Sequence, residues 1–108
     1  MDKITLLIAD DHTLVRQGLS ALFIAAPDIE VIGEAATGDE AIVKASELKP
    51  DVMLMDIQMP GVNGLEAARC ILYARPTIGI VMVTMLDDDN SVFAAMRAGA
   101  RVYFERGG

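Results

Sequence analysis

Short apolar segments and longer amphipathic segments alternate along the chain. The apolar segments are short enough to be buried strands, and they cover residues 4–9, 29–34, 51–56, 77–84 and 101–104. In the segments between them, apolar residues recur at helical spacing, as in Leu14, Val15, Leu19, Leu22 and Phe23. This pattern predicts helices over residues 13–25, 37 to about 48, 65–73 and 87 to about 99.

Turn and cap residues support these boundaries. Pro27 ends the first helix, and the second stops before Pro50. Thr37 and Glu40 have the spacing of a capping box at the start of the second helix. The three aspartates at 87–89 place negative charge at the start of the last predicted helix, where the helix dipole favours it.

The order of the elements predicts the fold class. Strand and helix alternate four times before a final strand, which indicates parallel strands, right-handed crossovers and helices on both faces. The apolar run at 51–56 is typical of a central strand, and the partly alternating run at 29–34 of one nearer an edge. We therefore expect an α/β fold, a doubly wound five-stranded parallel sheet, in a single domain over residues 1–108.

Composition excludes several function classes. The chain has 108 residues and a net charge of −7, so we expect neither a nucleic-acid surface nor a basic membrane-surface helix. Its apolar runs are far shorter than the roughly 20 residues that cross a bilayer, and its start does not resemble a signal peptide. The single cysteine, Cys70, indicates a reducing, cytoplasmic setting. We expect its side chain to pack rather than to take part in redox chemistry.

Candidate chemistry gathers at the carboxyl ends of the predicted strands, where open parallel sheets bind ligands. The residues there are Asp10 and Asp11 after the first strand, Asp56 ending the third, Thr84 ending the fourth and Arg106 just beyond the fifth. Any one of the acids alone is most simply a solvated loop residue. Three on one rim repel one another, and a divalent cation resolves that repulsion.

An all-oxygen site of this kind suits Mg²⁺, with Mn²⁺ as a possible substitute. A carboxylate beside such an ion can accept a phosphoryl group as an acyl phosphate, while a hydroxyl and a cation bind the other phosphoryl oxygens. Asp56, Thr84 and Arg106 provide that set. We expect His12, next to the acids, to lie near this site without a catalytic role.

The chain resembles the receiver domains of two-component response regulators, and within them the NarL/FixJ (LuxR-type) group. The resemblance covers essentially the whole chain and rests on residues 8–12, 51–61, 63–66, 83–84 and 98–100 leading to Tyr103. It implies a flavodoxin/CheY-like sheet with strand order 2-1-3-4-5. It also implies a phosphorylation-controlled switch, not an enzyme, that normally controls a transcription-regulating output domain.

The resemblance implies roles for the acids. Asp56 would be the phosphoacceptor, taking a phosphoryl group from a sensor histidine kinase in a Mg²⁺-dependent reaction. Asp11 would bind Mg²⁺ directly, Asp10 would help through water, and Asp56 and the backbone carbonyl of Gln58 would be further ligands. DNA would be bound only through an output domain absent from this chain.

Residues on the later strands would carry the switch. Thr84 would move toward the phosphoryl group, and Tyr103 would turn inward as it moves. Gln58 and Leu86 would flank the site and influence the rate at which the phosphoryl group on Asp56 is hydrolysed. The family's lysine, 22 residues past the switch hydroxyl, is Arg106 here; it keeps the charge but is bulkier and planar.

Another departure is length, because the family domain closes with a fifth helix and this sequence stops before it. We expect an uncovered apolar face and therefore self-association, as a homodimer. Together with Arg106, this departure keeps a second function open: a non-phosphorylated pseudo-receiver that binds partners constitutively. A flavin carrier fits less well, because Asp10 and Asp11 would repel its phosphate. A haloacid-dehalogenase-type phosphatase also fits less well, because it uses an Asp-x-Asp on the first strand, whereas Asp10 and Asp11 are adjacent and the expected nucleophile, Asp56, is on the third strand.

Overall fold

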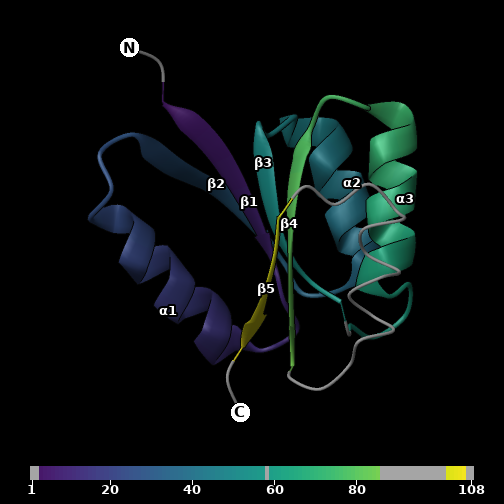
Figure 1. Cartoon of the computed structure of the whole chain (residues 1–108), viewed down its shortest axis with the longest axis horizontal. Coiled ribbons are helices and arrows are strands. Elements are labelled where there is room, and N and C mark those ends of the chain that lie inside the picture. Colours follow the sequence, from purple (N-terminus) through teal and green to yellow (C-terminus); the bar gives the residue numbers. More distant parts are fainter. Residues whose placement is uncertain (1–2, 58, 86–101, 107–108) are drawn as a thin grey trace.

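The strands of the protein form one parallel sheet (Figure 1). The computed structural model describes residues 3–57, 59–85 and 102–106, and for residues 84–85 and 102–106 it describes the backbone. The strands are β1 (Ile4–Ala9), β2 (Ile29–Ala35), β3 (Val52–Asp56), β4 (Gly79–Met85) and β5 (Val102–Arg106). Their order, β2-β1-β3-β4-β5, confirms the expected topology, with β3 at the centre and β2 at an edge.

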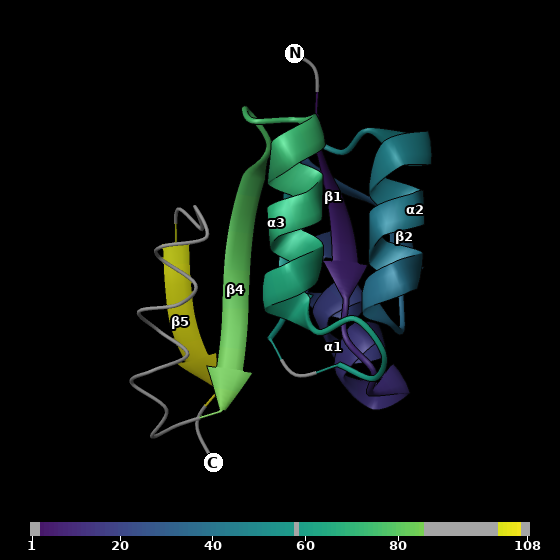
Figure 2. The ribbon, with the colours of Figure 1, turned by 90° about the vertical axis from the view of Figure 1, so that its right-hand side faces the viewer.

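Helices cover both faces of the sheet, as the alternating pattern predicts. The described helices are α1 (Thr13–Ile24), α2 (Gly38–Leu48) and α3 (Gly64–Ala74). Helices α2 and α3 pack side by side on one face, and α1 lies on the other (Figure 2). The helix predicted from residue 87 to about 99 falls outside the described residues.

Side-chain caps fix the starts of α2 and α3. The hydroxyl of Thr37 accepts a hydrogen bond from the Glu40 backbone N–H at 3.1 Å, as the capping-box spacing predicts. The Glu40 carboxylate accepts from the N–H of Ala36, one residue before the cap, at 2.6 Å. Asn63 caps α3 in the same way, because its side chain accepts from the Glu66 N–H at 3.0 Å.

Several strand boundaries differ from the prediction by one or two residues. The largest consequence is at β5, where Arg106 is the last residue of the strand instead of lying just beyond it. The reason is that β4 extends past Thr84 to Met85, which pairs with Arg106. At its other end β4 starts at Gly79, because the N–H of Ile78 is used in a turn back to the carbonyl of Arg75.

Alternation along the strands builds two cores. Side chains such as Leu7, Met53 and Ile80 face α2 and α3, while their neighbours Leu6 and Leu54 face α1. Because the period is two, Asp10 and Asp56 continue the sets of residues that face α1. The acids therefore lie where the core beneath α1 meets the carboxyl edge of the sheet.

The face of the sheet that carries α1 is only partly covered by the described residues. Beside α1 runs an apolar groove of about 380 Å³ whose lining includes Leu6, Val52, Val81 and Phe23. No helix among the described residues is long and apolar enough to span a membrane.

Candidate metal centre

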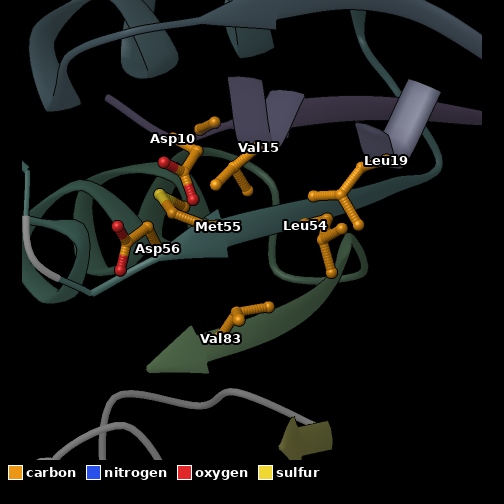
Figure 3. A pocket seen from close by; sticks show the side chains of 8 residues that line it. Asp10, Val15, Leu19, Leu54, Met55, Asp56 and Val83 are labelled. Carbon is orange, nitrogen blue, oxygen red and sulfur yellow. The ribbon is translucent and has the colours of Figure 1, made fainter. Parts of the chain in front are cut away.

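The ends of β1 and β3 bring two buried carboxylates side by side. Ala9 pairs with Met55, so Asp10 and Asp56 follow at the same level on neighbouring strands. Each is only 3% exposed. Both line a small hollow of about 60 Å³. Figure 3 shows them at one end of this hollow, with apolar residues such as Val15 and Leu54 along the rest of its lining. Burial of two acids at one sheet edge requires compensation of their charge.

The cluster has four members. Asp10, Asp11, His12 and Asp56 each offer one ligand atom, and these atoms all lie within 4.8 Å of one another. The structure thus brings together the three acids that the sequence predicts to converge, although they come from two distant parts of the chain. This geometry could hold one metal ion.

His12 is tied to both neighbouring acids. Its backbone N–H donates to Asp10 Oδ1 at 2.8 Å. Its ring Nδ1 lies 3.1 Å from the same oxygen and 3.0 Å from Asp11 Oδ1. The ring is 62% exposed, so it lies beside the acids at the rim, in keeping with the expected position near the site.

One oxygen of the cluster is left without a hydrogen bond. Asp11 Oδ1 is buried, and its close neighbour His12 Nδ1, 3.0 Å away, does not meet it with hydrogen-bond geometry, nor does any other donor among the described residues. A buried carboxylate oxygen without a donor is costly, and a cation is the partner that satisfies it best. Three carboxylates also form the oxygen-rich donor set that Mg²⁺ prefers. The residues present therefore fit a magnesium ion.

The loop that carries these acids is anchored by Arg16. Its Nη1 donates to the backbone carbonyl of Asp10 at 2.6 Å, and its Nη2 to the hydroxyl of Thr13 at 3.2 Å. Its Nε donates to Glu34 Oε1, at the end of β2, at 3.1 Å. Sequence reasoning missed this residue. A signal was available, since a cation in the first turns of a helix opposes the helix dipole and needs another reason to be there.

The segment after β3 folds back tightly on Asp56. The N–H of Ile57 bonds to the carbonyl of Val83, and the N–H of Gly64 bonds to the carbonyl of Ile57 at 2.7 Å. Gly61 has a φ of 73°, a conformation that favours glycine. The segment around Pro60 is therefore a loop whose backbone conformation is fixed by these contacts, and its composition predicts a loop.

The remaining predicted site residues are placed by strand register. Asp56 pairs with Val83, so Thr84 follows one residue further along β4. Tyr103 pairs with Met82 and Arg106 with Met85 on the edge strand β5. Gln58 and Leu86 fall outside the described residues.

Relatives of the chain are response regulators. It is 43% identical over 104 residues to the response regulator GacA of Pseudomonas viridiflava, covering 96% of this chain and 49% of that protein. The chain spans about half the length of the curated relatives it matches.

Solved structures show the same fold. The response regulator domain of Thermotoga maritima CheB matches with a TM-score of 0.89 and 39% identity, over 95% of this chain and 78% of that one. A LuxR-family two-component response regulator from Aurantimonas sp. SI85-9A1 matches with a TM-score of 0.90 and 33% identity, over 96% of this chain and 74% of that one. The likeness to the LuxR-type group is thus confirmed.

The family model of the response regulator receiver domain matches residues 6–106. The protein belongs to the response regulator receiver domain family.

Proposed function

We propose that this chain is a phosphorylation-controlled switch whose phosphoacceptor is Asp56. The observation that supports this most is the cluster of Asp10, Asp11 and Asp56, with ligand atoms within 4.8 Å of one another at the carboxyl edge of the sheet. A domain that only docked partners would have no need to gather three acids there, because their mutual repulsion lowers stability.

The proposed reaction is a simple phosphoryl transfer. A carboxylate oxygen of Asp56 attacks phosphorus, and the new O–P bond forms as the bond from phosphorus to the histidine nitrogen of a sensor kinase breaks. The imidazole leaves with the electron pair of that bond. Return to the resting state is hydrolysis of the acyl phosphate by water. The chain accepts and loses the group itself, so we propose that it is a switch rather than an enzyme acting on an external substrate.

Magnesium is the cofactor we propose, with Mn²⁺ as a substitute. Asp10, Asp11 and Asp56 would hold it, together with the backbone carbonyl of Gln58. When bound, the ion supplies positive charge that offsets the negative charge of the phosphoryl oxygens. His12 contributes by holding the carboxylate of Asp10 through its backbone N–H.

The switch itself is assigned to later strands. We propose that the hydroxyl of Thr84 moves toward the phosphoryl group, that Tyr103 follows it, and that Arg106 binds phosphoryl oxygens in place of the family lysine. The register supports nearness to Asp56, because Thr84 directly follows the residue that pairs with it. Phosphorylation would then shift an existing equilibrium between two states.

The partners follow from the family. Response regulators partner with sensor kinases and often bind DNA through output domains. We propose a sensor histidine kinase as the phosphoryl donor, an output domain that regulates transcription as the receiver of the signal, and the cytoplasm as the location. Self-association as a homodimer stays a prediction.

The alternative is a pseudo-receiver that binds partners without phosphorylation, which the replacement of the family lysine by Arg106 favours. Beryllofluoride, a mimic of the phosphoryl group, separates the two. With Mg²⁺ present it should change the amide NMR spectrum of the wild-type chain and leave that of Asp56→Asn unchanged. A wild-type spectrum that responds to neither Mg²⁺ nor beryllofluoride would support the pseudo-receiver instead.

A further inference from the structure

A chain of polar contacts connects α2 to the acidic loop. Lys44 on α2 donates to the backbone carbonyl of Glu34 at the end of β2. The carboxylate of Glu34 accepts from Arg16 Nε, and Arg16 Nη1 donates to the backbone carbonyl of Asp10. The loop after β1 is thereby tied to the edge strand and to the second helix.

Arg16 is the centre of this chain. Its side chain is only 14% exposed, and it donates hydrogen bonds to the loop after β1, to the start of α1 and to the end of β2. A planar guanidinium with several fixed donors can do this, whereas a lysine ammonium acts as a flexible point charge. The carbonyl that Arg16 binds belongs to the residue that begins the acidic cluster.

The helix dipole and a bound Mg²⁺ would both disfavour a cation at this place. A positive group near the first turn of α1 opposes the helix dipole, and near a metal centre it repels Mg²⁺. Its pairing with Glu34 at 3.1 Å offsets part of that cost. What Arg16 adds is geometry, because it fixes the backbone from which Asp10 and Asp11 project.

We propose that Arg16 is a positioning residue that holds the loop of Asp10 and Asp11 in the conformation that binds Mg²⁺. This rests on the proposed function of the site. Groups that orient metal ligands from behind typically change metal affinity by 10–100-fold when they are removed. Arg16 acts in this way through the main chain of Asp10, without touching the metal.

The test uses two variants that separate geometry from charge. Arg16→Lys keeps the charge and loses the fork of donors, and Arg16→Met loses both. If geometry governs, both weaken Mg²⁺ binding by about tenfold in isothermal titration. If charge governs, Arg16→Lys binds as the wild type does and Arg16→Met binds more tightly.

The matched control is Arg69, which donates to Glu66 at 2.9 Å on the outer face of α3. Both side chains of this pair are 56% exposed, so Arg69→Lys should leave Mg²⁺ affinity unchanged. A metal-free readout accompanies the titration. In EDTA, the His12 amide, which donates to Asp10 Oδ1, should exchange its hydrogen faster in both Arg16 variants than in the wild type.

Folding is checked by urea denaturation in EDTA, and Glu34→Gln serves if the Arg16 variants do not fold. That variant keeps an acceptor for Arg16 but loses its charge, so it should weaken Mg²⁺ binding in the same direction and by less. Wild-type affinity in the folded variants overturns the inference alone. Failure of the wild-type chain to bind Mg²⁺ overturns the proposed function and this inference with it.

Discussion

Gly64 lies directly against the backbone of Asp56. A β-carbon added at Gly64 would lie 2.1 Å from the Asp56 carbonyl oxygen and 2.7 Å from Ile57 Cα. Real β-carbons do not approach backbone atoms so closely, so only glycine permits this packing. The first residue of α3 is therefore coupled to the position of the proposed phosphoacceptor.

Gly64→Ala should accordingly destabilise the fold by about 3 kcal/mol, because the backbone of β3 or α3 must move to accept the methyl group. The same movement should slow phosphoryl uptake. Urea denaturation measures the first effect. Gly18→Ala is the control, since nothing lies within 4 Å of its added carbon; it replaces a helical glycine and should stabilise by about 1 kcal/mol. Equal effects of the two substitutions would contradict the account.

The acidic cluster should lower stability when no metal is present. Asp11→Asn removes one of three neighbouring negative charges, so in EDTA it should raise the free energy of unfolding by about 1 kcal/mol. With excess Mg²⁺ the order should reverse, because the wild type gains binding energy that the variant lacks. Urea denaturation in both buffers tests this, with exposed Asp28→Asn as a charge-matched control. A variant less stable than the wild type in EDTA would count against the repulsion.

Contacts at the amino-terminal ends of β1 and β3 should contribute to the stability of the fold at acid pH. The backbone N–H of Thr5, then its hydroxyl, and more weakly Arg75 hold the pKa of Asp51 below its usual value, against a small opposing effect of burial. The unfolded chain therefore binds the proton more readily. Stability from Asp51 is complete above the unfolded pKa and is lost as pH falls through the lower, folded pKa.

Asp51→Asn should therefore flatten the fall in unfolding free energy below about pH 4, and Thr5→Val should flatten it in part. Chemical denaturation at a series of acid pH values measures this slope. Identical slopes for the wild type and Asp51→Asn would show that the contacts at the start of β1 and β3 have no such effect.

Self-association is expected because one face of the sheet carries an apolar groove of about 380 Å³ beside α1. Sedimentation equilibrium should show a mass that rises from monomer toward dimer with protein concentration. A well-folded chain that stays monomeric at high concentration would refute this expectation.

Much of the fold follows from local pattern. The central place of β3 could be expected because the buried run at 51–56 is typical of a central strand, and β3 does lie there, whereas the full strand order is implied by the family resemblance. The meeting of Asp10 and Asp56 follows from parallel topology, which places both strand ends on one edge. The hydrophobic pattern is sufficient in these cases because the spacing of apolar residues and the burial that it predicts can be read from each segment separately.

Other features depend on contacts between segments and could not be obtained this way. The extension of β5 to Arg106 depends on how far its neighbour β4 runs. The role of Gly64 depends on how close α3 packs to β3, and that of Arg16 on three elements meeting around one side chain. A sequence pattern does not encode such distances.

The central claim is that Asp56 accepts a phosphoryl group, and intact-protein mass spectrometry tests it most directly. Incubation of the wild-type chain with acetyl phosphate and Mg²⁺ should add about 80 Da, and EDTA or Asp56→Asn should abolish the addition. A wild-type chain that gains no mass, or an Asp56→Asn chain that still gains it, would contradict the account.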